Sequence, residues 1–306
     1  MTFLSNLPLN PPSNLPPLTV RGTSICAGER RVVLRGVNRS GLEYAEPGSA
    51  GFLASAKITA EEIAVICRDW GASILRLPLN QDWALHGRGA YSDEDYLQSV
   101  DQVIAWAASH GAYTLLDLQW ISMEQEFGTL SDGSPNRIAP LPDLNSPRFW
   151  RKLAQRYRGQ PAVLFDLYNE PHDCSAEDWR YWATLLLRTI RDTHPDALCF
   201  VSGLDWGYDL RGAVLDEPNV VYSTHVYPGK ALPWSRAFGY LNGDVPLFAG
   251  EWGGTSENLE WGRRLADYFR QLEMGWTAWS WSDHPHLTRN GEATEFGALV
   301  REELRR

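Results

Sequence analysis

The chain has 306 residues, of which 43% are hydrophobic and 22% are charged, a composition typical of a globular protein with a sizeable core. This composition excludes intrinsic disorder, and no apolar run is long enough to cross a bilayer. The formal net charge of -10 would repel a phosphate backbone, so we expect no nucleic-acid partner.

The first 18 residues differ in composition from the rest of the chain. Residues 1–18 are rich in proline and have neither a basic start nor a continuous hydrophobic stretch, so they lack the pattern of an export signal. We expect an extended lead-in or the remnant of a linker, or equally a tail that lies on the folded domain. Residues 19–306 show no break in composition, which predicts a single domain.

Short runs of strand character alternate with longer segments of helical period. This alternation is typical of parallel strands joined by crossover helices. The runs number eight, and the strands are predicted at residues 32–38, 73–79, 113–120, 162–170, 198–203, 220–228, 246–253 and 275–281.

The first predicted helix, residues 59–71, shows the local signals most clearly. Thr59 is placed as its cap, Gly71 ends it, and Ile63, Ile66 and Trp70 lie near one face. The other helices are predicted at residues 93–111, 146–159, 175–195 and 258–275, each of which ends in Gly or Pro before the next strand.

Repeated strand-then-helix units without an internal break predict a closed (β/α)₈ barrel, the TIM-barrel fold, over residues 19–306. An open doubly wound sheet would be expected to have a Gly-rich phosphate-binding turn after its first strand, and the sequence has none there. Residues 19–31 predict a small hairpin that caps the floor of the barrel.

Functional groups in such a barrel lie at the carboxyl ends of the strands. The predicted strand ends carry Asn38, Arg76, Gln119, Trp120, Asn169, Glu170, His225, Tyr227, Glu251, Trp252, Trp279 and Trp281. Trp279 and Trp281 are two residues apart, so on a continuous strand they would face the same side. The residue types at this face are those of a site that binds polar and flat apolar groups together.

Glu170 and Glu251 end the fourth and seventh predicted strands, so closure of the barrel would bring them to one mouth. Glycoside hydrolysis needs two carboxyl groups in unequal environments, one protonated to serve as acid and one ionised to attack or to activate water. Either glutamate alone could equally cap a loop or lie on the surface. We interpret them as catalytic because they occur together with Arg76 and Asn169.

The remaining polar residues have supporting roles in this hypothesis. Arg76 would hold one glutamate ionised through a charge-assisted hydrogen bond, and Tyr227 could add a second donor. Asn169 would bond a sugar hydroxyl beside the reacting carbon, and His225 would tune the acid. We expect substrate binding by Trp279, Gln119, Trp120, Asn38, Trp252 and Trp281, although several of these tryptophans could as readily belong to the core.

No metal or cofactor is expected. His284 and His286 are separated by Pro285 and lack carboxylates at ligand spacing, which favours a loop over a metal site. The four cysteines, Cys26, Cys67, Cys174 and Cys199, lack the close spacing of zinc or redox sites and are expected to be free or mostly free thiols.

The segments "RGVN", "LRLPL", "LYNEPH", "STHVYP", "AGEWG" and "WTAWSW" follow one another on the predicted strands. In this order, from residue 19 to about residue 300, the chain resembles glycoside hydrolase family 5, the cellulase-type retaining barrels. The resemblance implies that Glu170 is the acid/base, that Glu251 is the nucleophile and that Arg76 orients it. It also implies that Asn169 and His225 contact the substrate or the acid, that Tyr227 bonds the nucleophile, and that Trp279 lies under the sugar at the cleavage site.

One position departs from the family pattern. Many members have a histidine near the end of the third strand, where this chain has Gln119 in "LDLQW". A glutamine carries no charge and can bond a hydroxyl only as a neutral group, which leaves the sugar at the cleavage site open.

The loop "HDC" after "NEP" and the "YSTHVYP" segment resemble bacterial endoglucanases more than mannanases, and this resemblance implies an endo-acting β-1,4-glucanase on cellulose-like or mixed-linkage β-glucan. The alternatives are a β-mannanase, an exo-acting β-glucosidase or transglycosylase, and a non-catalytic carbohydrate-binding barrel. We expect a β-linked oligo- or polysaccharide as the partner, a monomeric protein without membrane association, and, because the substrate is a polymer, secretion from the cell.

Overall fold

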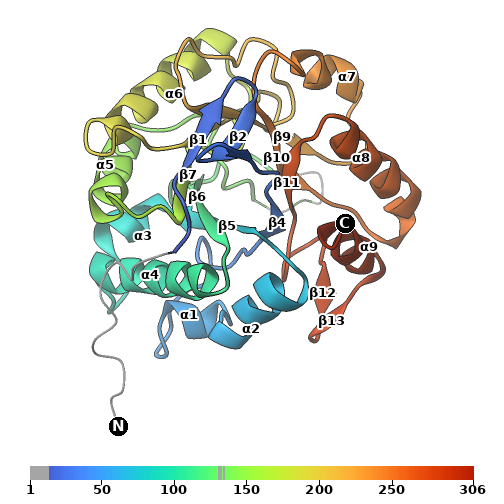
Figure 1. Cartoon of the computed structure of the whole chain (residues 1–306). Coiled ribbons are helices and arrows are strands. Elements are labelled where there is room, and N and C mark those ends of the chain that lie inside the picture. The colour runs from blue at the N-terminus through green and yellow to red at the C-terminus, as the bar shows by residue number, and fades with distance from the viewer. Residues whose placement is uncertain (1–13, 130–132, 134) are drawn as a thin grey trace.

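Eight parallel strands close into a barrel with the strand order β10-β11-β4-β5-β6-β7-β8-β9, and helices surround it (Figure 1). The computed structural model describes residues 14–129, 133 and 135–306. The barrel strands are β4 (Arg35–Asn38), β5 (Ile74–Asn80), β6 (Tyr113–Trp120), β7 (Val163–Asp166), β8 (Cys199–Ser202), β9 (Val220–Val226), β10 (Leu247–Trp252) and β11 (Gly275–Ala278). The predicted (β/α)₈ barrel and each of its predicted strands are confirmed.

Helices of unequal length form the outer layer. They are α1 (Phe52–Ser55), α2 (Ala60–Ala64), α3 (Gln81–His86), α4 (Asp93–Ser109), α5 (Ser146–Arg156), α6 (Ala176–Arg191), α7 (Trp234–Ala237), α8 (Leu259–Gln271) and α9 (Glu295–Leu304), with a π-helical turn η1 (Val65–Asp69) and 3₁₀ turns η2 (Gly239–Leu241) and η3 (Ser256–Asn258). A two-stranded ribbon, β12 (Thr288–Arg289) and β13 (Glu292–Ala293), precedes α9. In the described part of the chain, no helix has both the length and the hydropathy of a membrane span.

The helix predicted at residues 59–71 begins and ends where its signals place it. The Thr59 hydroxyl accepts a hydrogen bond from the Glu62 backbone N–H at 3.1 Å, which caps the first turn. Ile63 and Ile66 are buried against the core. The second half of the segment is the π-helical turn η1, and the chain leaves it through Gly71, whose φ of +87° favours glycine.

The floor of the barrel is closed by a small antiparallel sheet. It consists of β1 (Leu18–Arg21), β2 (Ser24–Ala27) and β3 (Arg30–Arg31). Leu18 and Ile25 pack in one apolar cluster with Leu34, Ile74 and Phe248 of the barrel. The predicted floor hairpin is therefore confirmed. Of the lead-in predicted for residues 1–18, residues 1–13 lie outside the described residues, and Leu18 already belongs to β1.

Five barrel strands end earlier than predicted, and the two that end earliest relative to the prediction, β7 and β11, affect the site. β7 ends at Asp166, so Asn169 and Glu170 lie in the loop that follows it. β11 ends at Ala278, so Trp279 and Trp281 lie beyond the strand and its alternation does not extend to them. The four cysteines are free thiols, and three of them are buried.

Arg39, the residue after β4, ties the barrel to two neighbouring segments. Its guanidinium donates to Glu62 Oε2 at 2.6 Å, to Ser282 Oγ at 2.9 Å and to the carbonyls of Ala56 and Lys57 at 3.1 Å each. The side chain is only 1% exposed. This one residue thus fixes α2 and the loop after β11 against the first barrel strand.

Arg39→Ala should lower the free energy of unfolding by about 3 kcal/mol, because it leaves a partly buried carboxylate and several carbonyls without their donor. Urea titration followed by circular dichroism would measure the change. The matched control is Arg68→Ala: Arg68 is 64% exposed and, among the described residues, pairs only with its neighbour Asp69, so its loss should leave the midpoint nearly unchanged. Equal shifts in the two variants would contradict the role given to Arg39.

Candidate active site

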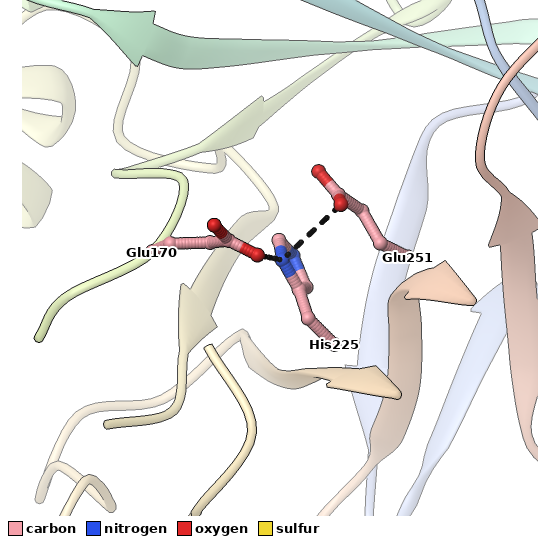
Figure 2. Close-up of side chains that lie close together, drawn as sticks. All are labelled: Glu170, His225 and Glu251. Carbon is pink, nitrogen blue, oxygen red and sulfur yellow. Dashed lines mark hydrogen bonds and ion pairs between the residues drawn. The ribbon is translucent and has the colours of Figure 1, made fainter. Parts of the chain in front are cut away.

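The structure brings six of the predicted site residues together at the carboxyl ends of the strands. They are Arg76 on β5, Asn169 and Glu170 after β7, His225 on β9, Tyr227 after β9, and Glu251 on β10. Figure 2 shows His225 between the two glutamates, with a contact to each. One carboxylate oxygen of Glu170 and one of Glu251 lie within 4.8 Å of each other.

Glu251 is held by two strong donors. Arg76 Nη1 donates to Oε1 at 2.9 Å, and the Tyr227 hydroxyl donates to Oε2 at 2.7 Å. The residue is 4% exposed, and burial raises its pKa, but Arg76 and the Tyr227 hydroxyl act against that rise. Of the two glutamates, Glu251 is therefore the one whose ionised form is stabilised by direct contacts.

Glu170 has a different environment. No cation lies within hydrogen-bonding distance of its carboxyl group among the residues that the structure describes, and its partner is His225 Nδ1, 2.9 Å from Oε1. Burial raises the pKa of Glu170 to about 7, against smaller opposing effects of Arg76, Lys230 and His172. At mildly acidic pH this carboxyl group is protonated and can act as an acid.

His225 lies between the two glutamates and is neutral in its resting state. Burial lowers its pKa to about 4, so at neutral pH the ring carries one proton. Nδ1 is 3.7 Å from Glu251 Oε2 as well as bonded to Glu170. Gly207 packs directly on the ring: a Cβ at this position would lie 2.8 Å from His225 Cγ, and the φ of +73° also favours glycine.

A β-bulge in β10 aims Glu251. The register between β9 and β10 shifts between Ala249 and Glu251, so that Glu251 pairs with His225. Gly250, inside the bulge, has no room for a side chain, because a Cβ there would lie 2.5 Å from Ser223 Oγ and 2.8 Å from His225 Nε2. The nucleophile candidate and the histidine thus depend on one local distortion.

Arg76 is the hub of the polar network under the site. Its fully buried guanidinium donates to Asp166 at 2.8 Å, to Asn38 at 2.9 Å and to Asn169 at 3.0 Å, in addition to Glu251. Asp117 Oδ1 lies 3.1 Å from Nη2. Sequence reasoning missed both aspartates, although an acidic residue inside an otherwise apolar strand run, as in "LLDL" and "LFDL", is a signal that could have found them.

Three of the expected substrate-binding residues are positioned for other roles. Asn38 is fully buried: its Oδ1 accepts from Arg76, and its Nδ2 donates to the Gly250 carbonyl at 3.0 Å, so it supports the guanidinium and does not bind sugar. Trp252 is 0% exposed and packs against Trp276 and Phe296, with ring centroids 5.2 and 5.5 Å away. Burial therefore corrects the expectation that Asn38 and Trp252 bind substrate.

Trp281 is also in the core. Its ring packs edge-on against Trp70 at a centroid distance of 4.6 Å, and its Nε1 donates to Glu62 at 2.9 Å. The expectation that it faces the same side as Trp279 is wrong, because β11 ends at Ala278 and the alternation stops there.

Trp279, Trp120 and Gln119 keep groups that a ligand could use. Trp279 and Trp120 are partly exposed; Trp279 Nε1 donates to the His284 carbonyl at 3.0 Å, and Trp120 packs near Tyr44 at 5.9 Å. Gln119 Oε1 is buried and accepts no hydrogen bond from the described residues. All three remain expected substrate contacts.

The acid side of the site has an unpredicted stacked pair. His172 and Trp206 lie parallel, with ring centroids 3.6 Å apart and planes within 8°. His172 Nδ1 donates to the Glu170 carbonyl at 2.8 Å, which ties the pair to the candidate acid. No spacing in the sequence links these residues, because Trp206 comes from the loop after β8.

Glu170, His225 and Glu251 could also be considered as cation ligands, since their ligand atoms lie within 4.8 Å of one another. The Arg76 guanidinium, 2.9 Å from Glu251, would repel a cation there, and each ligand group already has a protein partner. In the described residues, His284 and His286 are not part of such a group. The geometry therefore favours acid–base chemistry over metal binding.

The sequence profile described as "Cellulase (glycosyl hydrolase family 5)" matches residues 33–285. The chain belongs to glycosyl hydrolase family 5. Every residue of the site described above lies within the matched range. The motifs that indicated this family in the sequence lie there as well, from Arg35 at the start of the first to Trp281 at the end of the last.

Two curated relatives of this family 5 chain are named endoglucanases. An endoglucanase from Microbulbifer sp. is 25% identical over 285 residues, a match that covers 87% of this chain and 51% of the relative. Endoglucanase N from Pectobacterium atrosepticum is 25% identical over 304 residues, covering 90% of this chain and 62% of the relative. The chain thus spans about half to three fifths of the length of these relatives.

Solved structures share the barrel. A β-glucanase from Saccharophagus degradans in complex with cellotetraose superposes with a TM-score of 0.76 at 22% identity, covering 94% of this chain and 92% of that one. The catalytic domain of an endoglucanase from Thermobifida fusca, also in complex with cellotetraose, gives a TM-score of 0.73 at 20% identity, with 94% and 97% covered. At these identities the likeness supports the family 5 fold.

Proposed function

We propose that this protein is a retaining endo-β-1,4-glucanase that cleaves internal bonds of cellulose-like or mixed-linkage β-glucan by double displacement. The observation that carries the proposal is that one carboxylate oxygen of Glu170 and one of Glu251 lie within 4.8 Å of each other, which leaves no gap of the inverting kind between these two atoms. Retaining glycosidases have a separation of roughly 5–5.5 Å, whereas inverting enzymes need roughly 6.5–9.5 Å to admit a water. The endoglucanase relatives support the choice of β-glucan as substrate.

In the first step, a carboxylate oxygen of Glu251 attacks the anomeric carbon as the glycosidic C–O bond breaks. Glu170 gives its proton to the departing oxygen, so that the leaving sugar departs as a neutral alcohol. Arg76 and Tyr227 hold the Glu251 carboxylate in one orientation before the attack, which lowers the entropic cost of the step.

In the second step, the ionised Glu170 takes a proton from a water molecule, which attacks the same carbon and displaces Glu251. Two inversions restore the original configuration. His225 assists if Nδ1 carries its proton: it then donates to Glu170 Oε1 and leaves Oε2 free to hold the proton that moves. The neutral state of the ring at neutral pH is consistent with this role.

Substrate contacts follow from groups that remain unpaired at the mouth. Asn169 Oδ1 accepts from Arg76, but its buried Nδ2 has no partner among the described residues, so it is available to a sugar hydroxyl beside the reacting carbon. Trp279 provides a partly exposed ring for the apolar face of a pyranose. Gln119 contributes a neutral amide where a histidine is common in the family.

The test is to follow the hydrolysis of cello-oligosaccharides by proton NMR from the first turnover. The β-anomer should appear first and then mutarotate, and an initial α-anomer would exclude double displacement. Reducing-end release on carboxymethylcellulose, mixed-linkage glucan, glucomannan and xyloglucan separates the glucanase from a mannanase, and the product lengths separate endo from exo action. Binding without hydrolysis would indicate a carbohydrate-binding barrel.

The pH dependence of kcat/KM should be bell-shaped. The active acid is protonated Glu170, so activity should fall as the pH rises through about 7. Activity should also fall at low pH, where Glu251 becomes protonated and can no longer attack. Initial rates on a soluble β-glucan over the acidic to mildly alkaline range would show both limbs, and a profile that keeps rising above neutral pH would contradict the assignment of Glu170.

Secretion and a monomeric state are part of the proposal. A polymeric glucan does not cross a cell membrane, so the enzyme must meet it outside the cell. Activity found only in the cell fraction of the producing organism would oppose secretion, and a mass of more than one chain by light scattering would oppose the monomer.

A further inference from the structure

Three carboxyl groups surround a single guanidinium beneath the two catalytic glutamates. Asp117, Asp166 and Glu251 contact Arg76 at 3.1, 2.8 and 2.9 Å, and all the side chains involved are 0–5% exposed. If all three were ionised, the cluster would carry two uncompensated negative charges away from water. A buried charge without compensation is costly, and such a site takes up a proton instead.

The hydrogen bonds indicate where that proton lies. Asp166 Oδ2 accepts from Arg76 Nε, and Glu251 accepts from both Arg76 and Tyr227. Neither oxygen of Asp117 accepts a hydrogen bond from any residue in the described ranges. A fully buried carboxyl group without donors is the one that is most stable in its neutral form.

The neutral form of Asp117 also resolves a second unpaired atom. Asp166 Oδ1 is buried and accepts no hydrogen bond in the geometry of the described residues, although the Ser202 hydroxyl lies close enough to the Asp166 carboxyl to lower its pKa. Asp117 and Asp166 are register partners on β6 and β7, and both reach the same guanidinium. A protonated Asp117 has an O–H to donate, and Asp166 Oδ1 is an unpaired acceptor on the neighbouring strand.

We propose that Asp117 carries a proton in the resting enzyme and that ionised Asp166 is a positioning residue, which shares the Arg76 guanidinium with the nucleophile Glu251. This inference rests on the proposed double displacement. Before the attack, Asp166 prevents Arg76 from stabilising the Glu251 carboxylate too strongly. When Glu251 loses its charge by forming the glycosyl-enzyme, Asp166 still neutralises the charge of Arg76. Burial raises the pKa of Asp117 well above its usual range, with Arg76 opposing; burial also raises the pKa of Asp166, but there the hydrogen bond from Arg76 adds to the opposing effects.

Other charged and titratable groups face this cluster and belong to the same balance. Glu43 and Asp166 change the pKa of Asp117, and His225 changes the pKa of Asp166. Glu170 and His225 change the pKa of Glu251. Arg76 contributes in every case. Because these groups titrate together, the experiment compares variants that differ by one charge.

The comparison uses Asp117→Asn and the double variant Asp117→Asn with Asp166→Asn. Asp117→Asn replaces a neutral acid by a neutral amide, so the low-pH limb of kcat/KM should stay in place. In the double variant, the Asp166 charge is lost and Glu251 is the one carboxylate of the three that still pairs with Arg76. The pKa of Glu251 is therefore lowered. The low-pH limb should then move to lower pH by about one unit. Asp166→Asn alone is less informative, because Asp117 can release its proton and replace the lost charge.

A limb that moves in Asp117→Asn, or that stays in place in the double variant, would overturn the proposal. Carboxyl ¹³C NMR of the aspartate-labelled wild-type enzyme provides a readout that needs no substrate. One aspartate carbon should keep its protonated shift near neutral pH, and that signal should be lost in Asp117→Asn. A wild-type spectrum without such a signal ends the proposal, whether or not the enzyme hydrolyses β-glucan.

Discussion

Glu251→Gln should lower kcat on β-glucan by roughly 10⁴–10⁶-fold, the scale on which the loss of a covalent nucleophile acts. The amide has nearly the same shape as the carboxylate, but it has no negative charge and cannot form the glycosyl-enzyme. Arg76 Nη1 and the Tyr227 hydroxyl both donate to Glu251. In the variant, each group can hydrogen-bond to the amide or change its orientation locally, so folding should be retained. Hydrolysis of a soluble β-glucan, measured by reducing-end release at long times, gives the rate.

Two measurements make this result specific to chemistry. Circular dichroism and thermal unfolding of Glu251→Gln should match the wild type, and calorimetry with cellotetraose should show that binding persists. A mechanism-based inhibitor that traps the intermediate should label wild-type Glu251, and peptide mass mapping should locate it. Activity close to that of the wild type in the variant, or a label on another residue, would remove Glu251 from the mechanism.

Glu170→Ala should slow the hydrolysis of natural β-glucan by roughly 10²–10⁴-fold, the usual contribution of a general acid. The loss should be much smaller in the first step for an aryl glycoside with a good leaving group, because such a group departs without a proton. Water attack in the second step should then become slow, so that the glycosyl-enzyme accumulates. A burst of released phenol followed by a low steady rate would report this accumulation.

Azide provides the decisive control for Glu170. As a small anion that needs no general base, it should enter the space vacated by the side chain and restore turnover of the aryl substrate. The product should be the β-glycosyl azide, which shows retention directly. Equal losses for good and poor leaving groups, or no response to azide, would indicate that Glu170 acts through the structure of the loop and not as acid and base.

The sequence was sufficient to predict the barrel, because each strand–helix unit has its own periodicity and its own end signals. Thr59 caps α2, and the Gly71 stop follows its continuation, as their residue types indicate. The short α3, which begins directly after β5, and the C-terminal α9 were not predicted. Each begins at a local cap, Asn80 for α3 and Thr294 for α9, but their lengths depend on packing between distant segments.

Within the site, the residues at strand ends were predictable and those beneath them were not. Glu170 and Glu251 could be paired because barrel closure brings strand ends to one face. Asn38 was assigned to sugar binding because the sequence does not show that Arg76 and the Gly250 carbonyl use both ends of its amide. Trp252 and Trp281 were assigned to the mouth because residue type alone does not distinguish a buried ring from an exposed one.

The bulge at Gly250 limits how this barrel could be re-engineered. The same distortion sets the direction of Glu251 and the position of His225. A backbone change on β10 would therefore disturb both the nucleophile and the histidine that contacts the acid. A designer who wants a wider gap, and with it the opposite stereochemical outcome, would need to shorten a side chain and leave this strand as it is. Both steps of the reaction depend on this one bulge, so the residues that serve the two steps would have to change together.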